Sequence, residues 1–586
     1  MTLELSDWLL VAAYFVASAL IGLAYTRKAG GSLADYFVSG RSLPWWLAGT
    51  SMVATTFAAD TPLAVAGLVA KYGVAGNWLW WNLAFSGILT VFFFARLWRR
   101  AGVLTDVELA ELRYGGRPAA VLRGFRALYL ALPINLIIMG WVTRAMVTIL
   151  QITLDVDPWK AAIALFGITA VYSMLSGLWG VIVTDAFQFV VAMGGSIVLA
   201  VLAVDAVGGL ESFTTQVAAR FGSHEAAFGI LPPVGEAWLP LSTLVVFLAV
   251  QWWATWYPGA EPGGGGYVAQ RILSARDERH GLLATLWFNI AHYALRPWPW
   301  ILVGFVGALW YPDLPNPEHG YVRVMVDVLP SPLKGLLLAA FAAAYMSTIS
   351  THLNWGASYL VNDVYLRFIR PSASPRAQVL ASRVATGILM VLSLLVMNYL
   401  SSVERGWTIL IGLGAGTGLV LILRWYWWRI NAWSEISAMA ASSVTAAVLW
   451  SLGVDSGNTA SPDFARAMLV TVGVSTAVWL TVTLVTPPES DATLERFYRQ
   501  VRPGGPGWRP VSRRLGFGNE PIPGGALSWV NWVAGVIAVY AAVFAVGALL
   551  TGSPLRGGLH AGAALGAFSL IQRNLRRDKG LLRHVD

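Results

Sequence analysis

The sequence contains no cysteine, and only 12% of its 586 residues are charged. Without cysteine there can be no disulfide, no thiolate nucleophile and no cysteine-ligated metal cluster. Histidine and glutamate do not stand at zinc-protease spacing, and the sequence has no phosphate-binding P-loop and no serine-hydrolase elbow. An ATP-driven pump or a hydrolase therefore has no support, and we expect no enzymatic activity.

Apolar residues, by contrast, are abundant. They make up 56% of the chain, and the mean hydropathy is +0.61. Apolar runs of about 20 residues recur from end to end, and each could cross about 30 Å of hydrocarbon as a helix. The first run, Trp8 to Tyr25, follows Glu4 and Asp7 and precedes Arg27 and Lys28, so we interpret it as a retained span rather than a signal peptide. This composition predicts an all-α polytopic membrane protein.

Fifteen segments are long and apolar enough to be candidate spans: 7–25, 45–70, 76–98, 125–150, 159–176, 178–204, 239–260, 281–310, 334–361, 378–400, 405–428, 432–453, 464–486, 528–551 and 555–572. Nothing between them is long enough for a soluble domain. We therefore predict one transmembrane domain over 1–586, divided into a leading helix 7–25, a ten-helix core 45–428, additional C-terminal helices 432–572 and a tail 573–586.

The basic residues predict the orientation of the chain. Arginine-rich loops alternate with acidic-leaning ones, which places the N-terminus outside and the C-terminus in the cytoplasm of a bacterial inner (plasma) membrane. The predicted cytoplasmic loops are 96–126, 261–280, 362–377 and 487–527, and the external ones are 151–158, 205–238 and 311–333. Orientation explains the net charge of +9 more simply than nucleic-acid binding does.

Two spans contain helix-breaking sequences. The second span has Asp60-Thr61-Pro62 near its centre, and the seventh ends in Trp256-Tyr257-Pro258-Gly259. The two lie five spans apart, so they cross in opposite directions, as an inverted repeat of five plus five helices with a discontinuous helix opening each half requires. The eighth span, with Arg296-Pro297-Trp298-Pro299, is also expected to be interrupted.

The ninth span carries small and hydroxyl side chains on one helical face. Ala344, Ser347, Thr348 and Thr351 stand at i, i+3, i+4 and i+7, and Ser350 borders the same face. Hydroxyl and carbonyl oxygens suit a small hard cation. The alternative is that these hydroxyls bond to their own backbone and ease helix packing, and spacing alone favours that alternative.

Ionisable residues at membrane depth are a second group of candidates, because burial there is costly. They are Asp60, Arg144, Asp185, His292 and Arg296. Asp185 could bind a cation, relay protons or pair structurally with an arginine.

For a solute, Arg144 could hold a carboxylate and Asp60 an amine; alternatively the two neutralise each other, or Arg296 supplies the partner. Thr61 and Gln251 are further candidate solute contacts. Trp252, Trp253 and Trp256 could either line a cavity or anchor the helix in the bilayer.

Four stretches of the chain resemble the sodium:solute symporter family. The string Ala342 to Thr351, continuing to Asn362-Asp363-Val364-Tyr365, resembles the family's eighth core helix. Thr184-Asp185-Ala186-Phe187-Gln188 and Tyr267-Val268-Ala269-Gln270-Arg271 are similar to two further family patterns, and Gly49 to Gly73 fits its broken first core helix. The resemblance covers about residues 5–430.

The resemblance implies a LeuT-type fold with Na⁺ as the coupling ion. Its main sodium site implies the carbonyls of Ala54, Phe57 and Ala344 with the hydroxyls of Ser347 and Thr348. A second site, as in the sialic-acid branch, implies Asp185, Ser347, Ser350 and Thr351. Arg144 resembles the arginine that holds a carboxylate in that branch, whereas Thr61 replaces the amide residue of the sugar branch.

We therefore expect a sodium-coupled symporter that imports a small organic solute by alternating access, with the solute, sodium ions and the bilayer as partners and no nucleic acid. A carboxylate-bearing solute, such as an amino acid or a sugar acid, is the expected cargo. A membrane sensor with a transporter fold and a proton-coupled carrier remain the alternatives.

Overall fold

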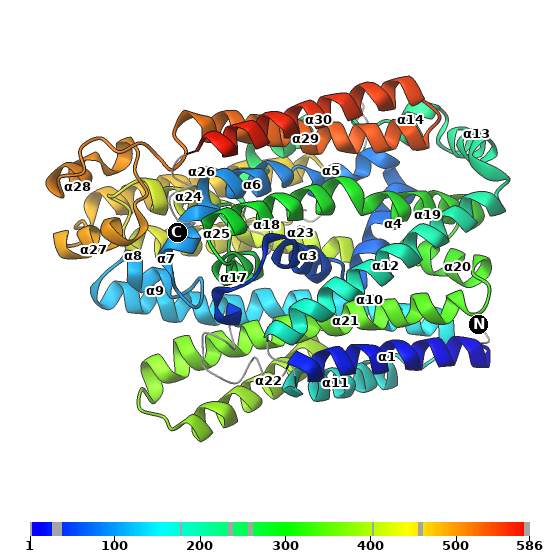
Figure 1. Ribbon diagram of the computed structural model, residues 1–586, viewed down its shortest axis with the longest axis horizontal. Helices are drawn as coiled ribbons and strands as arrows, with labels where there is room; N and C mark the ends of the chain where they lie inside the picture. Colours follow the sequence, from blue (N-terminus) through cyan, green and yellow to red (C-terminus); the bar gives the residue numbers. More distant parts are fainter. Residues whose placement is uncertain are drawn as a thin grey trace.

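A computed structural model describes residues 3–25, 38–175, 178–231, 238–255, 262–400, 403–454 and 461–578. Over these ranges the chain is helical, with no extended pairing beyond the isolated bridges Leu43–Ala275 and Thr255–Ala415. Figure 1 shows the long helices running side by side along the longest axis of the molecule. The predicted all-α fold class is confirmed.

The first half of the predicted core follows a leading helix. Its helices lie within the second to sixth predicted spans or extend them at their ends. The leading helix is α1 (Leu5–Tyr25). The helices of the first half are, in chain order, α3 (Trp45–Thr56), α4 (Asp60–Tyr72), α5 (Trp78–Trp81), α6 (Ala84–Leu89), α7 (Ala95–Ala101), α9 (Gly116–Tyr129), α10 (Asn135–Leu154), α11 (Pro158–Leu175) and α12 (Leu178–Ala206).

The second half repeats this succession and again opens with a discontinuous helix. Its members are α15 (Leu241–Val246), α16 (Trp252–Ala254), α17 (Gly266–Ser274), α18 (Glu278–Ile290), α19 (Pro297–Trp310), α21 (Leu333–Ser358), α22 (Pro375–Met397), α23 (Val403–Gly414) and α24 (Gly418–Tyr426).

Shorter helices gather at the two ends of the bundle, and four long ones follow the core (Figure 1). At one end lie α13 (Gly209–Phe221), α14 (His224–Phe228) and α20 (His319–Val328). At the other lie α8 (Leu109–Arg113), α27 (Asp491–Val501) and α28 (Arg509–Arg514). The long additional helices are α25 (Ala432–Ser451), α26 (Pro462–Val485), α29 (Ala526–Leu550) and α30 (Pro554–Arg577).

Length and apolarity test the predicted spans only in part. Six helices of the described residues are long and apolar enough to cross a membrane, or up to eight when each of two bent pairs is counted as one span. Helices occupy each of the fifteen predicted ranges, but many are divided by kinks or π-helical turns such as Leu130–Ile134. The number fifteen therefore stays a prediction.

The break in the second predicted span lies just before Asp60. Helix α3 ends at Thr56, α4 begins at Asp60, and the two are inclined by 61°. The Phe57 N–H closes α3 by donating to the carbonyls of Val53 and Ala54, at 2.9 and 3.0 Å. Pro62 falls in the first turn of α4, where its missing N–H has no intrahelical partner to lose. The interruption is confirmed, three residues earlier than the Asp-Thr-Pro sequence suggested.

The seventh predicted span is also discontinuous. Helix α16 ends at Ala254, and α17 begins at Gly266. Next to this break, the N–H of Gly416 donates to the Ala254 carbonyl at 2.9 Å, so the gap between α23 and α24 meets the gap after α16. The sequence Trp256-Tyr257-Pro258-Gly259 lies outside the described residues.

The eighth predicted span is not broken, contrary to the expectation from its prolines. A π-helical turn, Ala291–Leu295, and the single residue Arg296 connect α18 to α19. Pro297 occupies the first position of α19, where a proline needs no hydrogen-bonded N–H and its fixed φ suits the helix.

The end of α30 lies at the same end of the bundle as α7. Arg96 Nη2 of α7 contacts Asp578 Oδ2, directly after α30, at 2.5 Å. The first predicted cytoplasmic loop, 96–126, and the predicted tail therefore lie on one side, as the charge pattern requires. Which side of the membrane this is remains a prediction.

Arg113 holds that end of the bundle together. Its buried guanidinium donates to the carbonyls of Arg424 at 2.7 Å and Trp427 at 3.0 Å. It also lies over the rings of Tyr114, Phe497 and Trp508 at 4.9–5.2 Å. One cation thus joins α8, the end of α24 and the α27–α28 segment.

Replacing Arg113 with alanine should lower the free energy of unfolding by about 3 kcal/mol, because two buried carbonyls lose their charged donor and three rings lose a cation. The melting temperature of the purified protein measures this. Arg499→Ala on the exposed face of α27 is the matched control. Equal losses in the two variants would show that Arg113 does not hold this end together.

Candidate functional site

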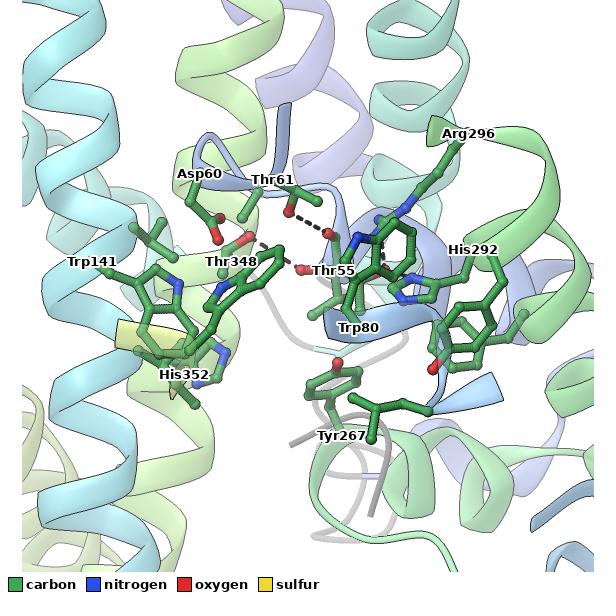
Figure 2. A pocket seen from close by; sticks show the side chains of 18 of the residues that line it. Thr55, Asp60, Thr61, Trp80, Trp141, Tyr267, His292, Arg296, Thr348 and His352 are labelled. Atoms are coloured by element: carbon green, nitrogen blue, oxygen red, sulfur yellow. Dashed lines mark hydrogen bonds between the residues drawn. The ribbon is translucent and has the colours of Figure 1, made fainter. Parts of the chain in front are cut away.

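A cavity lies beside the break between α3 and α4. Its volume is about 80 Å³, and its walls come from both halves of the core. Its polar lining residues are Thr55, Thr56, Asp60, Thr61, His292, Arg296, Thr348 and His352. Its aromatic lining residues are Trp80, Trp141, Tyr267, Phe288, Tyr293 and Trp407. Figure 2 shows side chains that surround the space.

Thr348 connects α21 to the end of α3. Its hydroxyl donates to the Ala344 carbonyl at 2.9 Å and to the Thr55 carbonyl at 3.3 Å (Figure 2). The last carbonyls of a helix lie outside its regular hydrogen-bond ladder, and here they accept from other groups: Ala54 from the Phe57 N–H, Thr55 from Thr348 and Thr56 from Thr61. The predicted sodium residues Ala54 and Phe57 flank Thr55, and Ala344 and Ser347 lie on the same helix as Thr348. The structure thus places the five residues on two elements in contact.

Asp185 of α12 is buried between hydroxyls and an arginine. Its Oδ1 accepts a hydrogen bond from Ser347, and its Oδ2 accepts one from Ser51 at 2.7 Å. Arg271 Nη2 lies 3.9 Å from Oδ2, and both side chains are 0–1% exposed. Of the alternatives that the sequence left open, the structural pair with an arginine is present, while cation binding and proton relay stay predictions. Arg271 is the last residue of the Tyr267–Arg271 string. Because a buried arginine needs a counter-charge, this residue was the sequence signal for the pair.

The other two residues of the predicted second site differ from each other. Ser350 donates to the Ser347 carbonyl of its own helix at 3.0 Å. The Thr351 hydroxyl is buried, and no described residue forms a hydrogen bond with it. Of the ninth-span hydroxyls, Ser350 therefore bonds to its own backbone, while Ser347 reaches another helix.

Asp60 and Thr61 begin α4 at the cavity. Asp60 is 3% exposed, and its Oδ1 has no hydrogen-bond partner. Figure 2 shows its carboxyl group on the cavity side of the chain, above Thr348. The Thr61 hydroxyl instead donates to the Thr56 carbonyl at 3.0 Å and so closes the break.

Arg296 binds the other side of the break. Its Nη1 donates to the Thr56 hydroxyl at 2.8 Å and to the Val53 carbonyl at 3.3 Å, and its guanidinium lies 5.2 Å from the centre of the Trp300 ring. His292 Nδ1 also contacts the Thr56 hydroxyl, at 3.1 Å. A cation therefore sits at the C-terminal end of α3, where the helix dipole is negative.

Four residues predicted to contact a solute do not line this cavity. Arg144 lies near α20 instead. Burial and the charges of Arg144 and Arg323 lower the pKa of His319, which is the first residue of that helix. Gln251 is buried and donates to the Leu79 carbonyl at 3.2 Å.

The indole N–H groups of Trp252 and Trp253 bond to carbonyls of their own helix, at 3.1 and 2.6 Å. Trp256 lies outside the described residues. The walls instead include Trp141, Tyr293, His352 and Trp407, none of which the sequence predicted. Periodicity does not show which aromatic side chains, among them 29 tryptophans, face inward.

A model of the sodium:solute symporter family matches residues 36–442. The chain belongs to this family. The symporter is 27% identical to sodium/glucose cotransporter 4 of Danio rerio over 470 residues, which cover 73% of this chain and 69% of that protein. It is 25% identical to the sodium/glucose cotransporter of Vibrio parahaemolyticus over 466 residues, covering 75% and 84%.

The fold is similar to that of a solved substrate-bound, outward-open Na⁺-coupled sialic acid symporter. The TM-score is 0.66 at 19% identity, and the similarity covers 83% of this chain and 99% of that one. The LeuT-type fold is confirmed. Membership of the family makes the protein a multi-pass membrane symporter that couples a small solute to Na⁺.

We expect Asp185 and Arg271 to be energetically coupled in the symporter. Asp185→Asn and Arg271→Gln should each lower the melting temperature, because each leaves a buried group without its counter-charge. The double variant should lose less than the sum of the two, with a coupling energy of about 1–3 kcal/mol. Thermal unfolding of all four proteins in sodium-free buffer measures this, and strictly additive losses would contradict the pairing.

Proposed function

We propose that Na⁺ binds between the end of α3 and α21 and that this ion couples to a solute in the adjacent cavity. One observation carries the proposal: Thr348 lines the cavity and also donates a hydrogen bond to the Thr55 carbonyl at the end of α3. The same side chain would therefore border both the ion and the solute.

The proposed ligands are the carbonyls of Ala54, Phe57 and Ala344 and the hydroxyls of Ser347 and Thr348. These are hard oxygen donors, the type that small hard cations prefer. Phe57 is the first residue after α3, and its carbonyl has no place in that helix. When bound, the ion supplies a positive charge that would hold the negative end of α3 against α21.

Coupling follows from the position of the break. Thr55 and Thr56 lie on its α3 side and Asp60 and Thr61 on its α4 side, and all four line the cavity. Fixing α3 against α21 sets the spacing of these residues and raises the affinity for solute. By linkage, the solute must raise the affinity for sodium by the same factor. Closure around the solute would then permit opening to the other side.

Asp185, Ser347, Ser350 and Thr351 form the proposed second sodium site. The unpartnered Thr351 hydroxyl and the Ser347–Asp185 contact support it. Arg271 competes with a cation there, because its guanidinium already lies beside the carboxylate. A second ion at this site therefore requires Arg271 to move away during the transport cycle.

We propose import into a bacterial cell across the inner membrane, with the N-terminus outside and the C-terminus in the cytoplasm. The arginines of the 96–126 loop and the end of α30 share one end of the bundle, which supports this orientation. Arg144 lies away from the cavity walls, so a carboxylate held by Arg144 finds no support in this cavity.

Thr348→Ala should raise the sodium concentration needed for half-maximal thermal stabilisation by roughly tenfold, the equivalent of one lost ligand, whereas Thr348→Ser should restore the wild-type response. Melting temperatures across a sodium titration, at constant ionic strength with potassium, measure this.

The matched control is Thr153→Ala, because Thr153 makes the same type of bond to its own helix, to the Ile149 carbonyl, at 2.6 Å. If Thr348→Ala leaves the sodium response unchanged, or if potassium stabilises as well as sodium, the ion does not bind here.

A further inference from the structure

We propose that the solute carries a positively charged nitrogen, which Asp60 and the aromatic wall of the cavity bind. The inference rests on the proposed function, because it takes this cavity to be the solute site. The proposed solutes are organic cations and zwitterions that carry an amine or an ammonium group. Neutral polyols and anions are the alternatives that it excludes.

The first step is the unmatched carboxylate. Asp60 is only 3% exposed, and its Oδ1 has no hydrogen-bond partner in the part of the chain that the structure describes. The charge of Arg296 acts on this carboxylate, but Arg296 Nη1 donates its hydrogen bonds to the end of α3 rather than to Asp60. Burying an isolated carboxylate is costly unless a partner of opposite charge accompanies it. A cationic solute would be that partner.

The second step is the position of the nearby arginine. Arg296 lines the same cavity, but its Nη1 contacts Val53 and Thr56 at the end of α3, and its guanidinium lies over Trp300. Figure 2 shows Asp60 and Arg296 on opposite sides of Thr61. Each group faces a helix end of opposite partial charge, Arg296 the C-terminus of α3 and Asp60 the N-terminus of α4. The carboxyl group of Asp60 and the guanidinium of Arg296 are thus held on the two sides of the break.

The third step is that the threonine and histidine side chains of the wall already make hydrogen bonds within the protein. The hydroxyls of its four threonines all donate to backbone carbonyls at 2.7–3.0 Å: Thr55, Thr56, Thr61 and Thr348. His292 and His352 contact Thr56 and Asn135. A polyol needs several unengaged donors and acceptors, and these side chains have little left to offer.

The fourth step is the aromatic character of the cavity. Trp80, Trp141, Tyr267 and Trp407 all line it, and Figure 2 shows Trp141 on one side of the space and Trp80 and Tyr267 on the other. Aromatic ring faces attract ammonium groups, tryptophan most strongly. Trp407 also interacts with the Asp60 carboxyl group, so one of these rings lies directly beside the carboxylate. A carboxylate enclosed by rings matches a cation better than a sugar.

The test compares solutes that have the same shape but different charge. Choline and its neutral analogue, in which a tert-butyl group replaces the trimethylammonium group, are added to the purified symporter with glycine betaine, glucosamine, glucose and myo-inositol. Melting temperatures in sodium and in potassium report binding. We expect sodium-dependent stabilisation by at least one ammonium or amine probe and none by the neutral analogue.

Asp60→Asn should weaken the binding of that probe by tenfold or more, whereas Asp313→Asn, at an exposed position of the 311–333 loop, should leave it unchanged. The sodium titration of Asp60→Asn without solute should still show stabilisation, which verifies that the variant is folded. The inference is overturned if no ammonium or amine probe stabilises at millimolar concentration, if the neutral analogue or a polyol binds equally well, or if Asp60→Asn binds the cation normally. Failure of the proposed function looks different: the wild type would then show no preference for sodium.

Discussion

The gap between α3 and α4 is the constraint on which the other features of the core depend. A helix that stops inside a membrane protein exposes carbonyls at one end and N–H groups at the other, and hydrocarbon offers neither a partner. Here side chains from both halves of the chain supply the partners: Arg296 at Val53, Thr348 at Thr55 and Thr61 at Thr56. The same carbonyl oxygens belong to the proposed ion site or adjoin it, so the contacts that stabilise the break and the proposed coupling site lie at one place.

The second half of the core contains corresponding gaps, and these gaps contact each other. The backbone of Gly416 bonds to Ala254, and a Cβ atom placed on Gly418 would lie 2.0 Å from the Trp253 carbonyl oxygen. Two chain segments therefore approach so closely that only glycine fits between them. Among the polar residues that line the cavity, Thr55, Thr56, Asp60, Thr61 and Arg296 stand where helices end or begin, whereas Thr348 and His352 lie within α21.

The sequence was informative wherever a local pattern determines the structure. Apolar length predicted the helices, the Asp60-Thr61-Pro62 sequence predicted the break between α3 and α4, and the spacing of the ninth-span residues predicted that Ser347 and Thr348 share one face. It failed where the outcome depends on packing. Arg296-Pro297 predicted an interruption, yet a proline at the first position of α19 is harmless. Arg144 and Trp141 stand three residues apart on α10, but Trp141 lines the cavity and Arg144 does not, a distinction that periodicity cannot make.

The contact between Asp185 and Arg271 has a consequence for the way the bundle moves. It joins α12 to α17, and Ser51 and Ser347 attach α3 and α21 to the same carboxylate. Any rocking motion that separated these four helices would strand two opposite charges in a dry interior. The elements around Asp185 must therefore travel as one rigid unit, or water must enter before they part. Separation of these four helices therefore requires hydration of the buried charge pair.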